Sequence, residues 1–229
     1  DAGKPGDNVS IKIRGLGSIN NCDPLVVIDG VPTDLGLSSL NMADVERLDV
    51  LKDASATAIY GSRGANGVVM ITTKRGTEGK GKLAVSANYS FQNATNVPSL
   101  LNAAQYAELS NDMMVNSGRN PNPEWANPSE LGAGTDWMDA IFRTGSLEHY
   151  ALSLSGGSDT MKGFASFAYD DDKGVLLNTY ARKFSAKANL DFQVVKWLKV
   201  SERVSYEYKN GQGDVGTGHE GVLNQAVFF

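Results

Sequence analysis

The sequence contains very little of the chemistry on which metal centres and enzymes depend. It has one cysteine and two histidines in 229 residues, so neither an intrachain disulfide nor a cysteine-rich metal site can form. His149 and His219 are far apart in the sequence, and neither has a partner at a metal-ligand spacing. A nucleophile elbow of the Gly-x-Ser-x-Gly type is also missing. The sequence therefore predicts no metal, no cofactor and no enzyme activity.

Long apolar runs and an excess of positive charge are missing as well. No stretch approaches the roughly 20 apolar residues that a membrane-spanning helix needs, whereas a membrane-spanning strand needs only about 9–11 alternating residues. The formal net charge is −5 and no basic stripe is present, which argues against nucleic acid as a partner. The first residue is not methionine, and no signal peptide precedes the first predicted strand. We therefore expect this sequence to be a segment of a longer protein.

The first 79 residues mix helix and strand signals. Apolar alternation or continuous apolar runs predict strands at residues 11–14, 25–28 and 47–51. Asp29-Gly30 predicts a turn after the second of these strands, and Pro32 is expected to end the ladder there. Asn41 is expected to cap a short helical turn that leads into Val45.

The most informative run extends from Asp49 to Gly76 and predicts a strand end, a short helix, a turn and a second strand. Asp53 can cap a helix from Ala54 to Tyr60, because its carboxylate can accept the unpaired amides of the first turn. A β-branched run predicts the strand at residues 68–73. A Walker loop would instead need Gly-Lys-Ser/Thr opening a helix. The turn between helix and strand is expected to use glycine-only conformations at Gly61, Gly64 and Gly67.

Beyond a glycine-rich hinge at residues 76–81, the pattern changes to strict alternation. Five segments have one apolar and one polar face, at residues 83–91, 149–155, 161–170, 183–192 and 198–208. Aromatic residues lie near the segment ends and charged residues lie on the polar faces, which fits the girdles and wet lumen of a membrane barrel. A soluble β-sandwich is the alternative on patterning alone. Glu202 interrupts the apolar face of the last segment.

A long insert separates the first two alternating segments, at about residues 94–146. Helical spacing predicts a helix from Leu100 to Val115, with Asn102 as its cap. Three aromatic residues of the insert could stack on sugar rings or contact a partner, although core packing explains them equally well: Tyr106, Trp125 and Trp137. Further on, the run Asp170–Gly174 is predicted as a solvated turn, because it lacks the alternating frame of a calcium loop.

Three blocks of the N-terminal part closely resemble the plug domain of TonB-dependent outer-membrane transporters, and are most similar to the SusC/RagA branch of Bacteroidota. The blocks are Ile11–Gly17, Pro24–Pro32 and Asp49–Gly76. The resemblance implies an α+β plug domain followed by antiparallel strands of a transmembrane β-barrel. The implied boundaries are residues 1–79 for the plug and 80–229 for the start of the barrel, with an extracellular insert at about 94–146. A complete barrel of this kind has about 22 strands around a plugged lumen.

The resemblance also implies a function and a set of partners. The implied function is energy-coupled import of glycan or peptide nutrients across the outer membrane of a Gram-negative bacterium. The implied partners are TonB with ExbB/ExbD, a SusD-like surface lipoprotein acting as a lid, and outer-membrane lipid. Two alternatives remain, a signalling receptor of the same fold and a soluble β-rich carbohydrate-binding module.

Plug arginines in such transporters look inward to glutamates of the barrel wall, which suggests a latch. The candidates in this chain are Arg14, Arg63 and Asp53 in the plug, and Glu202 and Glu207 in the wall. Capping of loop carbonyls explains the two arginines equally well. The short turns at residues 157–160 and 194–196 are expected to face the periplasm, and the insert and residues 211–218 the outside.

Overall fold

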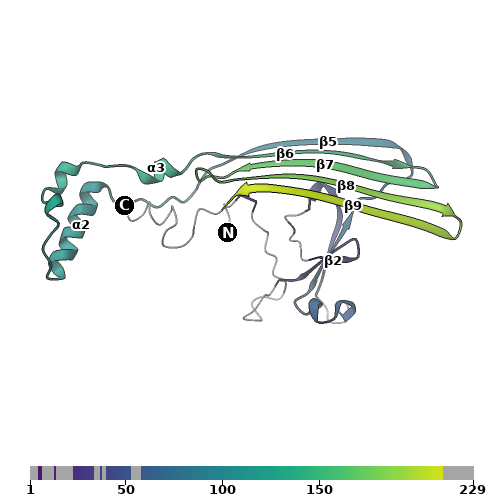
Figure 1. The fold of residues 1–229 in the computed structure, drawn as a ribbon, viewed down its shortest axis with the longest axis horizontal. Helices are drawn as coiled ribbons and strands as arrows, with labels where there is room; N and C mark the ends of the chain where they lie inside the picture. The colour runs from purple at the N-terminus through teal and green to yellow at the C-terminus, as the bar shows by residue number, and fades with distance from the viewer. Residues whose placement is uncertain are drawn as a thin grey trace.

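Two β-sheets organise the chain, a small sheet near the N-terminus and a large sheet that follows it (Figure 1). The structure is a computed structural model that describes residues 5–6, 13, 23–33, 37, 40–52 and 58–213. The small sheet has the strand order β2-β1-β4-β3, and the large sheet has the order β5-β6-β7-β8-β9. In Figure 1 the small sheet lies below the large sheet, against one of its two faces.

The small sheet combines parallel and antiparallel pairing around a short apolar core. Its strands are β1 (Leu25–Ile28), β2 (Val31–Thr33), β3 (Val45–Leu51) and β4 (Val68–Thr73). Strands β1 and β4 are parallel, so their carboxyl ends meet at the same edge. The core consists of apolar, mainly β-branched residues that are almost fully buried: Leu25, Val27, Val68, Val69 and Ile71.

Local capping signals in this region are confirmed, whereas the reading of Pro32 was wrong. The Asn41 side chain accepts a hydrogen bond from the Ala43 backbone N–H (2.9 Å) and caps the 3-10 turn η2 (Met42–Asp44). Pro32 was expected to end the ladder, but it lies inside β2, opposite Val27. Among the described strands, β2 lies at the edge of the small sheet, so the N–H that proline lacks is not needed for a ladder with another of them.

The glycine-punctuated turn is only partly as predicted. Residues 53–57, which include the predicted cap Asp53, lie outside the described residues. The segment η3 (Ala58–Gly64) is 3-10 helix rather than α-helix, and it is kinked at Gly61, where φ is 59°. Gly67 also has a positive φ, of 98°. Gly64 does not: it is a buried part of η3, so the expectation that it needs a glycine-only conformation was wrong.

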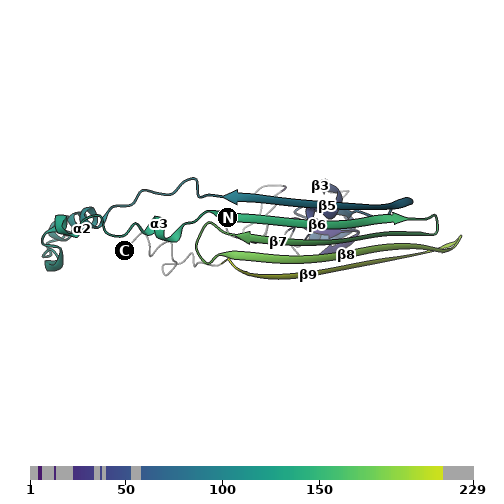
Figure 2. The ribbon, with the colours of Figure 1, turned by 90° about the horizontal axis from the view of Figure 1, so that it is seen from above.

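The large sheet is formed by the five predicted strands, which are all antiparallel to their neighbours. They are β5 (Gly79–Gln92), β6 (Gly145–Gly157), β7 (Met161–Lys173), β8 (Tyr180–Val195) and β9 (Leu198–Gln212). Figure 2 shows them side by side in this order, as an up-and-down meander. The connections β6–β7 and β8–β9 lie at one end of the sheet, and the insert and the β7–β8 connection lie at the other.

The pairing register sorts the side chains of the large sheet onto two faces. Alternate residues of a strand point to opposite faces. The inner face, which meets the small sheet, carries Ser166, Lys187 and Asn189. The outer face carries a row of directly paired aromatic residues across four strands: Tyr150, Tyr169, Phe184 and Tyr208. The outer face is therefore the apolar face that the sequence pattern predicts.

The turn predicted at Asp170–Gly174 lies further along the chain, at residues 174–179. Strand β7 continues to Lys173, and the connection to β8 spans residues 174–179. Basic residues on β8 explain the longer strand, because Lys183 lies opposite Asp170 and Arg182 lies opposite Asp171. Cross-strand pairs of opposite charge stabilise a ladder. The carboxylates therefore belong to the sheet rather than to a solvated turn.

The insert between β5 and β6 is a separate projecting unit. It contains α2 (Ala103–Asn116), η4 (Pro123–Trp125), η5 (Pro128–Leu131) and α3 (Trp137–Ile141). The predicted cap is confirmed, because Asn102 and Gln105 form a reciprocal capping box (2.8 and 3.1 Å). Figures 1 and 2 both show α2 well beyond the ends of the strands. None of the helices in the described residues is long and apolar enough to cross a lipid bilayer.

Candidate functional site between the two sheets

The small sheet meets the inner face of the large sheet through polar groups. Four of these groups come from the N-terminal part: Asp29, Asp44, Thr73 and the carbonyl of Lys74. Three come from the inner face: Ser166 on β7 and Lys187 and Asn189 on β8. A contact built from directional polar bonds holds a defined position, yet each bond can be exchanged for a bond to water when the sheets separate.

Asp29 is the centre of this contact. It follows β1, and Thr73 ends the parallel neighbour β4, so the two side chains meet at the same sheet edge. The Asp29 carboxylate accepts hydrogen bonds from the Thr73 backbone N–H (2.9 Å) and from Thr73 Oγ1 (2.5 Å). Lys187 Nζ lies 3.6 Å from Asp29 Oδ2, and the two side chains are 10% and 11% exposed. A buried ion pair therefore joins the small sheet to the large one.

The surroundings of Asp29 favour its ionised form. Burial by itself acts to raise the pKa of the Asp29 carboxyl group. The hydrogen bonds from Thr73 and the positive charges of Lys187 and Arg75 outweigh burial, so the pKa lies below its ordinary value of 3.8. Asp29 therefore stays charged at any pH at which the protein is expected to work.

A second set of bonds flanks the ion pair. Ser166 Oγ donates a hydrogen bond to Asp44 Oδ2 (2.7 Å), and both residues are buried. Asn189 Nδ2 donates to the carbonyl of Lys74 (2.8 Å) and to Thr73 Oγ1 (3.2 Å). These bonds fix the position of the end of β4 against the inner face of the large sheet.

The backbones of the two sheets come into direct contact where the chain passes from one to the other. A Cβ atom placed on Gly76 would lie 2.2 Å from the backbone nitrogen of Gly163 on β7. No real side chain tolerates such a distance, so only glycine fits at this position. The linker between β4 and β5 therefore packs directly against the backbone of the large sheet.

Low pH is expected to weaken the contact between the two sheets, because it protonates the Asp29 carboxylate. The pKa of Asp29 is lower in the folded protein than its unfolded value of 3.8. Its contribution to the stability of the contact is therefore present above pH 3.8 and is lost as the pH falls through the lower folded-state pKa. The urea midpoint for release of the small sheet, followed by protease sensitivity of the full-length protein, should fall as the pH is lowered through 3.8 and below. In Asp29→Asn the fall should be smaller; an equal fall in both proteins would contradict the assignment.

Of the five residues predicted as a latch, the structure describes three: Arg63, Glu202 and Glu207. Arg14 and Asp53 lie outside the described residues, and Arg63 lies exposed on η3. Glu207 is on the inner face, opposite Ser185, whereas Glu202 is opposite Leu190 on the outer face, turned away from the small sheet. Glu202 is therefore removed from the latch hypothesis by its position.

The ion pair that the structure does contain has the opposite polarity, with the acid on the small sheet and the base on the large one. Sequence reasoning missed both members. Asp29 was interpreted only as a turn residue, and Lys187 only as one charge of a polar face. Their one sequence signal was the position of Asp29 directly after a continuous apolar strand.

A second charged group lies on the inner face, nearer to the insert. His149 Nδ1 is 2.6 Å from Asp170 Oδ1, and Lys183 Nζ is 3.5 Å from Asp170 Oδ2. The register places these residues next to one another on β6, β7 and β8, with Lys209 following on β9. In the described part of the chain, no three His, Cys, Asp or Glu side chains are grouped to hold a metal ion.

Two of the three aromatic residues of the insert come together. The rings of Tyr106 and Trp125 meet edge to face, with centroids 5.9 Å apart. Asn111 holds the Trp125 backbone in place by donating to its carbonyl (2.9 Å). Trp137 begins α3, in the stretch that returns to β6, and is 41% exposed. The Tyr106–Trp125 pair thus takes part in the packing of the insert, although Tyr106 is as exposed as Trp137, at 41%.

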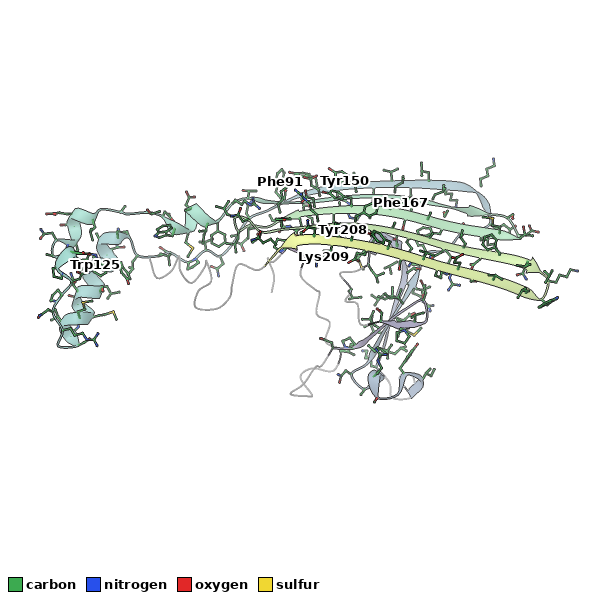
Figure 3. All side chains as sticks on the ribbon, in the orientation of Figure 1. Phe91, Trp125, Tyr150, Phe167, Tyr208 and Lys209 are labelled. Atoms are coloured by element: carbon green, nitrogen blue, oxygen red, sulfur yellow. The ribbon has the colours of Figure 1, made fainter. Side chains whose placement is uncertain are left out.

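The outer face of the large sheet presents an apolar band, which Glu202 interrupts on β9. Figure 3 shows Phe91 and Tyr150 on the face turned away from the small sheet and Lys209 on the other. From the aromatic row at Tyr150 toward the β6–β7 turn, the outer face of β6 carries Leu152 and Leu154, which are 42% and 53% exposed. A band of exposed apolar residues below an aromatic row is the pattern of a lipid-facing barrel wall.

Comparison with known proteins identifies relatives of this arrangement. The family model of the TonB-dependent receptor plug domain matches residues 1–68. TonB-dependent receptor P3 of Formosa agariphila is 38% identical over 240 residues, which cover 100% of this chain and 22% of the relative. TonB-dependent receptor SusC of Bacteroides thetaiotaomicron is 39% identical over 201 residues, which cover 82% of this chain and 19% of the relative.

Solved structures agree with the sequence comparison. The RagAB peptide importer in its closed-closed state superimposes with a TM-score of 0.76 at 28% identity, covering 90% of this chain and 26% of that one. Its open-open state gives a TM-score of 0.74 at 29% identity, with the same coverage. The chain therefore spans about a fifth to a quarter of the length of the relatives that it matches.

Proposed function

Because this chain belongs to the SusC/RagA-like TonB-dependent transporters, we propose that the whole protein imports glycan or peptide nutrients across the outer membrane in an energy-coupled step. The small sheet belongs to the plug, and β5–β9 belong to the wall of the barrel. Its relatives are receptors and transporters rather than enzymes. We propose TonB with ExbB/ExbD as the source of energy and a SusD-like lipoprotein as the lid.

The observation that carries this proposal is the polar contact between plug and wall. A plug that moves during each transport cycle has to leave the wall without exposing a large apolar surface. The contact contains the Asp29–Lys187 pair and the hydrogen bonds of Asp44 and Asn189. Force transmitted by TonB would break these bonds in turn, and water would satisfy the separated groups. The transport step is then conformational gating rather than bond chemistry.

A latch between a plug arginine and a wall glutamate stays part of the proposal. Arg14 and Arg63 are its candidates on the plug, and Glu207 is the candidate on the inner face. The Asp29–Lys187 pair and such a latch would have opposite polarity. Plug and wall would then attract each other at two points.

The experiment that tests the function is purification of the full-length protein from native outer membranes in mild detergent. A surface lipoprotein recovered in equal amount supports the importer, and a retained glycan or peptide names the substrate class. Uptake of that substrate should stop when TonB is deleted. Recovery of the protein only in the soluble fraction, without a lipoprotein, would overturn the proposal.

The proposed orientation places the insert outside the cell and the β6–β7 and β8–β9 turns in the periplasm. In a variant without native cysteines, Ser129→Cys in the insert should react with a membrane-impermeant maleimide on intact cells. Asp159→Cys in the β6–β7 turn should react only after the outer membrane is permeabilised. Both residues are exposed, so access alone does not separate them. Labelling of position 159 on intact cells would reverse the orientation.

A further inference from the structure

A row of charged residues crosses the outer face of the large sheet, at the end that carries the insert. The row consists of residues that are directly paired from β6 to β8, in the order Glu148, Asp171 and Arg182. It lies one step beyond the aromatic row that begins at Tyr150. Lys173 is two residues beyond Asp171 on β7 and therefore points to the same face. Two acidic and two basic side chains are thus gathered next to the apolar band.

Asp171 holds Arg182 by one edge of its guanidinium group. Arg182 Nε lies 3.4 Å from each of the two carboxylate oxygens of Asp171. The Cζ atom of Arg182 lies 5.5 Å from the centre of the Tyr180 ring. Within the described part of the chain, the Nη groups of Arg182 have no hydrogen-bond partner. The second edge of the guanidinium group is therefore open to a ligand.

Glu148 holds Lys173 in a similar way, close to Arg182. Lys173 Nζ lies 3.7 Å from Glu148 Oε1, and the Tyr150 O–H donates a hydrogen bond to Glu148 Oε2 (3.2 Å). Lys173 is paired with Tyr180, and Arg182 lies two residues further along β8, so the two basic residues are diagonal neighbours. Diagonal neighbours have Cβ atoms about 7–8 Å apart, which long side chains can span. Lys173 and Arg182 can therefore converge on one anion.

The basic side chains of this group are much more exposed than the acidic ones. The Arg182 side chain is 54% exposed, and that of its partner Asp171 is 11% exposed. The Lys173 side chain is 42% exposed, and that of its partner Glu148 is 23% exposed. The surface that meets the surroundings is therefore positive, although the charges of the group balance. A planar guanidinium group beside a lysine matches the oxygens of a phosphate group, to which arginine donates two parallel hydrogen bonds.

Exposed aromatic residues lie around the two basic residues and indicate where the phosphate comes from. Tyr89 and Phe91 are 55% and 72% exposed, and their rings meet edge to face with centroids 5.0 Å apart. The register places Tyr89 in the row of Arg182 and Phe91 in the row of Lys173. Figure 3 shows Phe91 on the outer face, nearer to the insert than Tyr150. Aromatic residues on the outside of a barrel lie at the level of the lipid headgroups, so a phosphate at this level belongs to a lipid.

Building on the proposed import function and orientation, we propose that Arg182 and Lys173 bind the phosphate of lipid A, the glycolipid that forms the outer leaflet of a Gram-negative outer membrane. The acyl chains of the bound lipid lie along the apolar band, over Leu152. Asp171 and Glu148 are positioning residues, because they hold the two basic side chains and expose little surface of their own.

Binding of lipid A with a single phosphate group to the full-length protein in detergent tests this proposal. EDTA is present, so that no divalent cation can join the lipid to the acidic residues. Native mass spectrometry should show at least about tenfold weaker binding in Arg182→Gln and in Lys173→Gln, since each loses hydrogen bonds between charged groups. Lys199→Gln removes an exposed lysine from the inner face and should change nothing. Unchanged affinity in either outer-face variant, or equal binding of lipid A without its phosphate, would overturn the proposal.

Inorganic phosphate separates a lipid site from a site for a free anion. It should not displace lipid A, because it has no acyl chains to cover the apolar band. Displacement by inorganic phosphate would overturn the assignment to a lipid.

A second readout uses the full-length protein folded into vesicles of phosphatidylcholine. Added lipid A should raise the urea midpoint of the natural protein, because a ligand of the folded state stabilises it. It should not raise the midpoint of the double variant Lys173→Gln, Arg182→Gln, and an equal rise in both proteins would contradict the site. A protein that takes up its substrate with TonB but does not distinguish lipid A from the form without phosphate keeps the import function and loses this inference.

Discussion

Replacing Lys187 by methionine is expected to weaken the seating of the plug more than any other single change on the inner face. The substitution leaves the Asp29 carboxylate buried, with Thr73 as its neutral partner. Loss of one member of a buried ion pair costs about 3–5 kcal/mol. We expect the lower end of that range, because the bonds of Asp44 and Asn189 remain. With a urea dependence of about 1–3 kcal/mol per molar, the midpoint for plug release should fall by about 1 M or more.

The same measurement on matched variants separates the pair from a general effect of charge. Lys199→Met removes an equivalent lysine from the wall, but that side chain is 54% exposed and pairs with Asp191 of the wall itself. Its midpoint should be unchanged. Asp29→Asn combined with Lys187→Met should be more stable than Lys187→Met alone, since no unpaired charge is left buried. Equal midpoints for Lys187→Met and the natural protein would show that the pair does not hold the plug.

The weakened contact should also be visible in cells. A plug that leaves the wall more easily should let compounds that the closed barrel excludes pass without TonB. Cells carrying Lys187→Met are therefore expected to become sensitive to a large antibiotic that the intact outer membrane excludes, while cells carrying Lys199→Met are not. Normal exclusion by Lys187→Met cells would limit the role of the pair to stability.

Local patterns in the sequence were sufficient for most of the secondary structure that the described residues show. The caps Asn41 and Asn102 act within three residues of their own position, so they could be identified without knowledge of the fold. The five strands of the large sheet follow from a period of two that each segment carries by itself. The predictions for Pro32 and for the Asp170–Gly174 run were wrong because the structure there does not depend on local sequence alone. What decides them is the neighbouring strand: β1, with which Pro32 pairs, and β8, whose basic residues lie opposite Asp170 and Asp171.

The site between the two sheets depends on contacts between residues that are far apart in the sequence. Asp29 and Lys187 are separated by more than half of the chain, and they meet only because β1 and β4 are parallel and β8 has one particular register with β7. A shift of that register by one residue would turn Lys187 to the outer face. No local pattern encodes this register, so the sequence could supply charged candidates but not their partners.

The second large effect is expected on the outer face, where Leu154→Arg places a charge near the middle of the apolar band. Leu154 lies on β6 between the aromatic row at Tyr150 and the β6–β7 turn, beside Leu83 and Ala165 of the neighbouring strands. An arginine on the lipid face of a barrel costs about 2–4 kcal/mol at the bilayer midplane and much less near the interfaces. The full-length protein folded into lipid vesicles should therefore unfold at a clearly lower urea concentration.

The matched control is Asn88→Arg, which adds the same side chain to an exposed position on the inner face of β5. An exposed polar position should tolerate arginine within about 0.5 kcal/mol. A large loss for Leu154→Arg together with no loss for Asn88→Arg would place lipid on the outer face, because water penalises neither substitution. Equal effects would mean that the outer face meets water or protein, and the apolar band would then need another partner.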